Sequence, residues 1–118
     1  MGLLIIIVVA NDVAAVFDAL ADPTRRTVVQ LLSHGPRRAG EIAAAAGMSG
    51  PAMSRHLRIL LAAGVVSDER SPVDARVRVF HLRPDAMAAA ADWLDQLQAH
   101  WDEQLRSFQR HVTRRNPG

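Results

Sequence analysis

The sequence predicts one mainly helical domain with a small β-hairpin, in the order of four helices, two strands and a long last helix. Helix-start residues precede several segments with apolar residues at helical spacing. Two β-prone runs flank a short turn at residues 71–75. After that turn, apolar residues recur at steps of three and four. At 118 residues, the chain is long enough for a single modest core.

The first two helices each combine a start signal with an apolar stripe. Asn11 or Asp12 can cap the first helix. Its apolar residues are Val13, Val16, Phe17 and Leu20. Asp22 and Pro23 then provide the N-cap and the first position of the second helix. Gly35 and Pro36 end that helix.

A third and a fourth helix follow around a glycine turn. The third is expected from about Arg38 to Ala46, and Gly47 suits a left-handed conformation after it. Ser49 can cap the fourth helix, and Gly64 ends it. The apolar arc of the fourth helix is Met53, Leu57, Leu60 and Leu61, and Arg55 and Arg58 point the opposite way. This helix therefore offers one face to a core and a basic face to a partner.

The C-terminal half begins with the hairpin and ends with the long helix. The strands are expected at 65–69 and 77–82, and Pro84 opens a helix that runs to about Val112. This order of elements is that of a winged helix-turn-helix, in which the third and fourth helices form the helix-turn-helix pair. Accordingly, we expect an apolar extension at 1–10, the domain with a C-terminal dimerisation helix at 11–112, and a basic tail at 113–118.

The net charge of +2 conceals a segregation of charge along the chain. Residues 1–24 carry three acids and no base. Residues 25–83 carry ten arginines against four acids, a sum of +6. Residues 84–105 carry five acids and no base, and four arginines follow. The basic block contains the fourth helix and the hairpin, which favours a nucleic-acid partner.

Several function classes lack their signatures. The chain has no cysteine, so it can form neither a disulfide nor a thiolate metal site, which fits a cytoplasmic location. No phosphate loop, nucleophile elbow or paired-histidine zinc helix is present, so neither an enzyme nor a cofactor is expected. The apolar run at 3–10 is too short to span a bilayer. It is interpreted either as an extension upstream of the domain or as part of a dimer interface.

From about Val13 to Val112 the chain resembles the ArsR-type winged-helix transcriptional repressors. The resemblance is carried by LADPTRR at 20–26, SRHL at 54–57, AGVV at 63–66 and the hairpin. The last helix, with DWL at 92–94 and HWDE at 100–103, is similar to a subgroup without metal sites. Genes of that subgroup often lie beside those for small START-like proteins. The resemblance implies a homodimer, formed by the first and last helices, on an imperfect palindrome in a promoter.

The expected DNA contacts lie at the start of the third helix, on the fourth helix and on the hairpin. They are Arg38, Ser49, Gly50, Pro51, Ser54, Arg55, His56, Arg58, Arg70, Arg76 and Arg78. Arg55 is the candidate for reading a base, with guanine as its natural partner. Gly50 departs from the polar residue common in the family, which removes one possible base contact. His56 has two open interpretations, a phosphate contact or a packing residue.

The expected dimer interface is apolar. It comprises Val13, Val16, Phe17, Trp93, Leu94, Leu97, Trp101, Leu105 and Phe108. Alternatives stay open: a small-molecule effector held between these helices, a metal-responsive repressor, or an effector-binding or protein-interaction module that has lost DNA binding. Positions matching the metal ligands of one family branch are Pro84, Ala86, Leu97 and His100, of which only His100 can bind a metal. No metal site is therefore expected.

Overall fold

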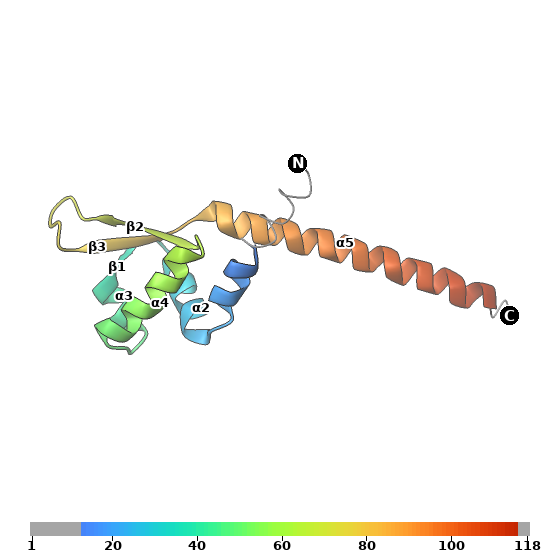
Figure 1. Ribbon diagram of the computed structural model, residues 1–118, viewed down its shortest axis with the longest axis horizontal. Helices are drawn as coiled ribbons and strands as arrows, with labels where there is room; N and C mark the ends of the chain where they lie inside the picture. Colours follow the sequence, from blue (N-terminus) through green and yellow to red (C-terminus); the bar gives the residue numbers. More distant parts are fainter. Residues whose placement is uncertain (1–12, 116–118) are drawn as a thin grey trace.

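The structure is a computed structural model that describes residues 13–115 (Figure 1). The apolar run at 3–10 and the predicted caps Asn11 and Asp12 lie outside the described residues. A first helix over residues 13–20 is followed by α2 (Pro23–Leu32), β1 (Arg37–Arg38), α3 (Ala39–Ala45), α4 (Gly50–Ala62), β2 (Val66–Arg70), β3 (Arg78–Leu82) and α5 (Pro84–Arg115). The predicted fold class, four helices, a hairpin and a long helix, is confirmed.

The predicted helix boundaries are set by local capping chemistry. The carboxylate of Asp22 accepts the backbone N–H groups of Thr24 (2.8 Å) and Arg25 (3.2 Å), and Pro23 begins α2. The hydroxyl of Ser49 accepts the N–H of Ala52 at 3.3 Å in the first turn of α4. Gly47 adopts φ +65° in the turn between α3 and α4, a conformation that a side chain would strain. These predictions are confirmed.

The sheet contains a strand that the sequence does not predict. Arg37 and Arg38 form β1, which pairs antiparallel with β3 and gives the order β1-β3-β2. The expectation that the third helix begins at about Arg38 holds to within one residue, because Arg38 is the N-cap, with an extended backbone (φ −74°, ψ 149°), and α3 begins at Ala39. A strand of two residues is too short to show a periodicity, and its pairing with Phe80 and Val79 joins distant parts of the chain.

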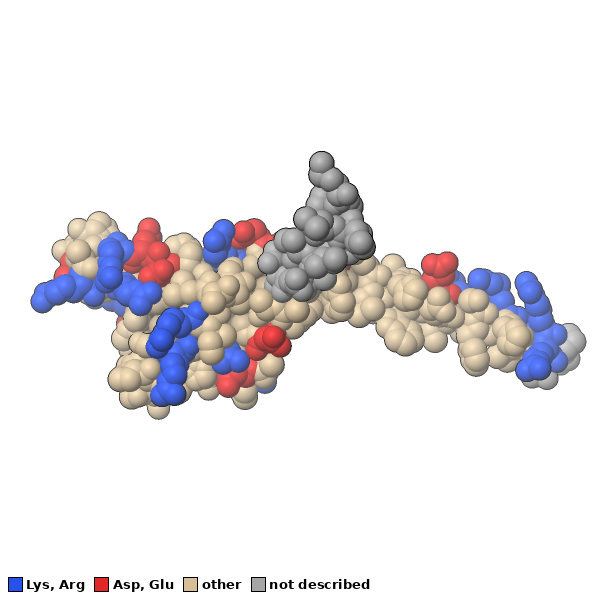
Figure 2. Space-filling view, viewed as in Figure 1, with Lys and Arg blue, Asp and Glu red and all other residues tan. Residues whose placement is uncertain are grey.

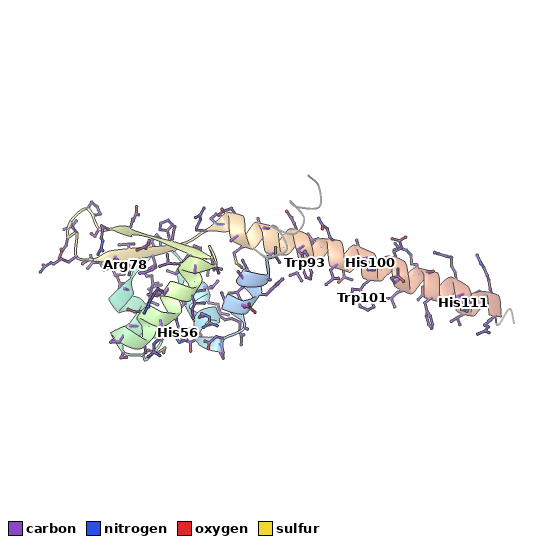
Figure 3. All side chains as sticks on the ribbon, in the orientation of Figure 1. His56, Arg78, Trp93, His100, Trp101 and His111 are labelled. Atoms are coloured by element: carbon purple, nitrogen blue, oxygen red, sulfur yellow. The ribbon has the colours of Figure 1, made fainter. Side chains whose placement is uncertain are left out.

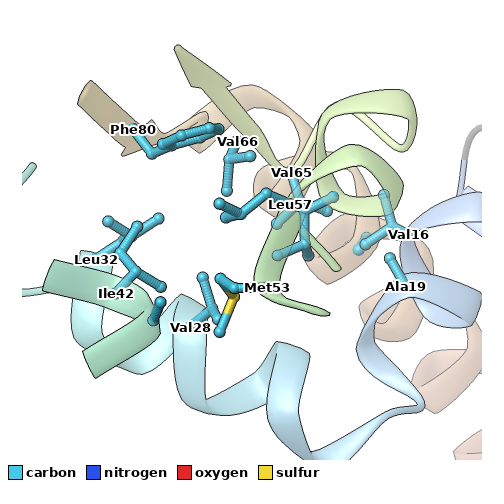
Figure 4. Packing of buried hydrophobic residues seen from close by; sticks show 13 residues of the cluster. Val16, Ala19, Val28, Leu32, Ile42, Met53, Leu57, Val65, Val66 and Phe80 are labelled. Carbon is cyan, nitrogen blue, oxygen red and sulfur yellow. The ribbon is translucent and has the colours of Figure 1, made fainter. Parts of the chain in front are cut away.

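The core lies between the sheet and the helices of the domain (Figure 4). Phe80 of β3 is fully buried, and it packs over side chains that come from α2, α3 and α4. The largest fully buried side chains are Phe80, Ile42, Met53, Leu60, Val28, Val65 and Val66. Three members of the predicted arc of α4, Met53, Leu57 and Leu60, are therefore confirmed in the core. Their burial fixes which face of α4 remains outside.

The last helix leaves the domain and continues alone for most of its length (Figure 1). α5 has 32 residues and buries only Ala90 among them. It continues to Arg115, so residues 113–115 of the predicted tail are helical. Its apolar side chains are open to solvent, with Trp101 58% and Phe108 65% exposed. None of the helices described within residues 13–115 is both long and apolar enough to cross a membrane.

The cap of α2 gives a prediction about pH. Backbone N–H groups, that of Arg25 foremost, hold the pKa of Asp22 below its usual range, although partial burial opposes them. A depressed folded pKa means that the stabilisation is present above about pH 4 and is lost as pH falls further. We expect Asp22→Asn to lower Tm at neutral pH, with the difference from wild type shrinking towards pH 3. Thermal melts over this range measure it. Asp92→Asn, on the exposed surface of α5, is the control, and an equal pH dependence in both variants would contradict the prediction.

Candidate DNA-binding surface

The turn between α3 and α4 fixes how α4 is presented. Backbone N–H groups of Gly47 and Met48 donate to the carbonyls of Ala44 (3.1 Å) and Ala43 (3.0 Å), which closes the end of α3. Ser49 then starts α4 in an extended conformation. Because the arc of Met53, Leu57 and Leu60 is buried, the other face of α4 must point outward. This is the geometry of a helix-turn-helix pair.

The structure gathers the predicted α4 residues on that outward face. The exposed ones are Ser49, Gly50, Pro51, Ser54, Arg55 and Arg58. His56 is half-buried at the edge of this face. No acidic residue occurs in α4, so the charges of Arg55 and Arg58 have no counterion on their own helix. Arginine side chains gather over the α3–α4 end and over the hairpin, together with acidic side chains beside the hairpin (Figure 2).

Two of the three predicted hairpin arginines already have carboxylate partners. Arg76 donates to both carboxylate oxygens of Asp74 at 3.1 Å. Arg78, which is labelled in Figure 3, donates to Asp68 at 2.7–2.8 Å. It also lies over the ring of Phe80, 5.0 Å from its centroid. The side-chain hydrogen bond from Arg76 is the largest cause that holds the pKa of Asp74 below its usual range.

These pairs differ in how firmly they hold the arginine. Arg76 is 91% exposed, so its ion pair is weak and can be exchanged for a phosphate at little cost. Arg78 is only 41% exposed and is also held by the ring of Phe80. Within 66–82, Arg70, Arg76 and Arg78 are balanced by Asp68, Glu69 and Asp74, a net charge of zero. The excess positive charge near the hairpin therefore comes from outside it, from Arg55 and Arg58 of α4 and from Arg37 and Arg38 of β1.

The unpredicted strand β1 explains the position of Arg38. Because β1 pairs with β3, Arg38 lies beside the hairpin as well as at the N-cap of α3. A shallow groove of about 380 Å³ runs between them and is lined by Arg38, Glu41, Arg76 and Arg78, with Ala39, Gly40 and Val77. Arg38 is 63% exposed, and its backbone N–H donates to Glu41 at 3.4 Å. The sequence predicts Arg38 as a DNA contact but not this neighbourhood.

One contact at the edge of the surface involves Arg25, which belongs to the LADPTRR motif but is not among the expected DNA contacts. A guanidinium nitrogen of Arg25 lies 3.3 Å from Nδ1 of His56. His56 therefore has an observed packing partner, while a phosphate contact through its other ring nitrogen stays open. The nearest signal in the sequence is the double arginine that follows Asp22, Pro23 and Thr24, directly after the first helix.

The predicted dimer residues fall into two groups. Val13 and Val16 are 3% exposed, so their own protomer already covers them, and they offer little surface to a partner. Phe17 and Trp93 contact each other edge to face, with ring centroids 5.6 Å apart. The members that retain exposed apolar surface are Phe17, Trp93, Leu94, Leu97, Trp101, Leu105 and Phe108.

Neither the metal site nor the effector pocket considered from the sequence has a clear counterpart among the described residues. Among residues 13–115 no three histidine or carboxylate side chains are close enough to share a metal ion. His100 and His111 are separated by about 16 Å along α5, given the helical rise. A hollow of about 390 Å³ lies beside Val13, Gly64 and Ala86, away from Trp101. An effector pocket at the expected dimer interface stays a prediction.

A helix-turn-helix with an exposed basic second helix, a hairpin beside it and a long helix behind it defines a winged-helix DNA-binding regulator. The profile described as "Bacterial regulatory protein, arsR family" matches residues 22–68. The HTH-type transcriptional regulator Rv2034 of Mycobacterium tuberculosis is 40% identical over 78% of this chain and 80% of its own. The chain belongs to the ArsR family of transcriptional regulators, so the resemblance read from its motifs is confirmed.

Two further relatives carry more detailed descriptions. The transcriptional repressor SdpR of Bacillus subtilis is 49% identical over 47% of this chain and 61% of its own. A solution structure of a homodimeric winged helix-turn-helix DNA-binding domain, Mb0332 of Mycobacterium bovis, matches with a TM-score of 0.59. It is 28% identical and covers 83% of this chain and 85% of that one.

The paired hairpin arginines give a second prediction. Asp68→Asn weakens the hold on Arg78 and should strengthen non-specific DNA binding. The slope of log K against log salt should steepen by about 0.9 for each Arg78 of the dimer that gains a phosphate. Glu69→Gln is the matched control. It removes the same charge from the same strand, but Glu69 is not the carboxylate that pairs with Arg78. Fluorescence titrations with duplex DNA at several salt concentrations measure both. Identical slopes for the two variants would show that Asp68 does not keep Arg78 from DNA, and would contradict the prediction.

Proposed function

We propose that this regulator is a homodimeric repressor that binds an imperfect palindrome in a promoter, with α4 of each protomer in the major groove. The exposed face of α4, which carries Arg55 and Arg58 and no acid, is the observation that carries the proposal. Bound there, the dimer would occlude RNA polymerase. Its place of action is the cytoplasm, where the chromosome of a bacterium lies.

Only a few groups of α4 would read a base or bind a phosphate. Arg55 would donate two hydrogen bonds to O6 and N7 of a guanine. Pro51 has no N–H and that of Ala52 is taken by Ser49, so the backbone N–H of Gly50 is the donor left for a phosphate in this turn. The hydroxyl of Ser49 can also donate to that phosphate, and Ser54 and Arg58 supply further backbone contacts.

The apolar side of α5 supports the dimer. Its leucines and aromatics are between 38% and 65% exposed, and such a continuous apolar face is normally covered in solution. A second copy of α5 offers the same apolar face in return, as a two-fold interface requires. The similar Mb0332 domain is itself a homodimer. In a dimer whose two α4 helices enter successive major grooves, those helices lie about 34–36 Å apart.

The recognition helix is tested by two substitutions with different expected signatures. Arg55→Ala should cost about 1–3 kcal/mol for each half-site and relax the preference at one position of each half-site. Arg58→Ala should weaken binding to all sequences similarly and reduce the salt slope by about 1 for each protomer of the dimer. Operator sequences selected from a random pool, followed by titration at several salt concentrations, measure both effects.

Arg114→Ala is the control, because it removes the same charge from the far end of α5. If wild type selects no sequence, the chain is an effector-binding or protein-interaction module on this fold, and the proposal is wrong. If wild type binds but Arg55→Ala and Arg58→Ala match Arg114→Ala, α4 is not the recognition helix.

The dimer is tested by placing a charge on the apolar face of α5. Leu105→Glu should yield a monomer at micromolar concentration and lower operator affinity, because a carboxylate would be buried between the two copies. Gln96→Glu introduces the same charge on the polar side of α5 and should leave the dimer intact. Light scattering coupled to size-exclusion chromatography measures the mass. A monomeric wild type, or a dimeric Leu105→Glu variant, would contradict the proposed interface.

A further inference from the structure

Arg25 and Arg26 close the end of the first helix. The last carbonyls of a helix have no partner within it, and cationic side chains stabilise them. Arg25 donates through Nε to the carbonyl of Ala19 (2.5 Å) and through Nη2 to that of Asp18 (3.2 Å). Arg26 donates through Nη1 to the carbonyls of Leu20 (2.9 Å) and Ala21 (3.0 Å). Both arginines thus bind the same helix end.

Only Arg25 also reaches α4. Its remaining nitrogen, Nη1, lies 3.3 Å from Nδ1 of His56. A guanidinium can only donate, so Nδ1 of His56 must be the acceptor in this contact. The ring proton of His56 is then on Nε2, which points away from Arg25 across the ring. His56 lies on α4 between Arg55 and Arg58, at the edge of the exposed face (Figure 3).

The same first helix also contacts α5. Phe17 packs edge to face on Trp93, with centroids 5.6 Å apart at 64°. A continuous set of contacts therefore runs from α5 through Phe17 to the end of the first helix, and from there through Arg25 to His56. The two ends of this set are the helix expected to form the dimer and the helix expected to read DNA.

We propose that Arg25 is a positioning residue for DNA recognition. It holds His56 in the tautomer whose Nε2–H donates to an operator phosphate, and it ties α4 to the first helix. Arg25 does so without touching DNA itself. This inference rests on the proposed function. It gives each ring nitrogen of His56 one of the two roles considered above: Nδ1 contacts Arg25, and Nε2 contacts a phosphate.

Arg26 supplies a matched control for the experiment. Arg25→Gln and Arg26→Gln each remove one charge and the contacts to the end of the first helix, but only Arg25→Gln removes the contact to His56. Thermal melts of the full-length variants should show similar losses of Tm. Operator affinity should fall about tenfold more in Arg25→Gln than in Arg26→Gln, as is usual for coupled residues in contact. In a His56→Ala background the two variants should bind equally.

A second measurement reports on the ring directly. Nitrogen NMR of the labelled protein, with His56 assigned through His56→Ala, should show the proton on Nε2 in wild type and in Arg26→Gln. In Arg25→Gln the proton should be shared between the two nitrogens. A proton on Nδ1 in wild type, or equal operator affinities of the two glutamine variants while wild type binds, would overturn this inference alone. Absence of operator binding by wild type would instead overturn the proposed function on which it rests.

Discussion

The recognition surface depends on burial of one face of α4. Met53, Leu57 and Leu60 are almost without exposure, and they join Phe80 and Ile42 in a single cluster. A helix anchored by three side chains at such spacing cannot rotate without exposing them, and each would cost about 2–5 kcal/mol if truncated. The outward direction of Arg55 and Arg58 is thus a consequence of the core, and it needs no contact of the arginines themselves.

The hairpin and α4 differ in net charge: the hairpin is neutral, whereas α4 is positive. The hairpin carries three arginines but no net charge, since three carboxylates balance them, and two of these carboxylates, Asp74 and Asp68, pair with Arg76 and Arg78. These pairs fix the form of the hairpin more than they draw it to DNA. On α4 the arginines have no acid on their own helix, so the field there remains positive. Under the proposed function, such an arrangement would direct the phosphate backbone to α4 first, and the hairpin would then exchange carboxylates for phosphates.

The features that the sequence predicts are those set by neighbouring residues. The caps Asp22 and Ser49, the turn at Gly47 and the arc of α4 each depend on residues within a few positions, and all were predictable. Strand β1 and the contact between Arg25 and His56 depend on partners far along the chain. Nothing in the local pattern around Arg37 or Arg25 names those partners, because the fold as a whole brings them together. The pairing of Asp68 with Arg78 depends in the same way on the hairpin register.

Two-fold symmetry makes the orientation of α4 count twice. In a homodimer on a palindrome, a displacement of α4 relative to α5 occurs in both protomers and in opposite directions along the DNA. The spacing of the two helices therefore changes by twice the displacement of one, while the distance between major grooves is fixed at about 34–36 Å for one turn. A small loss of rigidity between α4 and the dimer helix would then weaken both half-sites together. This gives a physical reason to connect the two through a buried core, through Phe17 and Trp93, and through a guanidinium whose three nitrogens all bind.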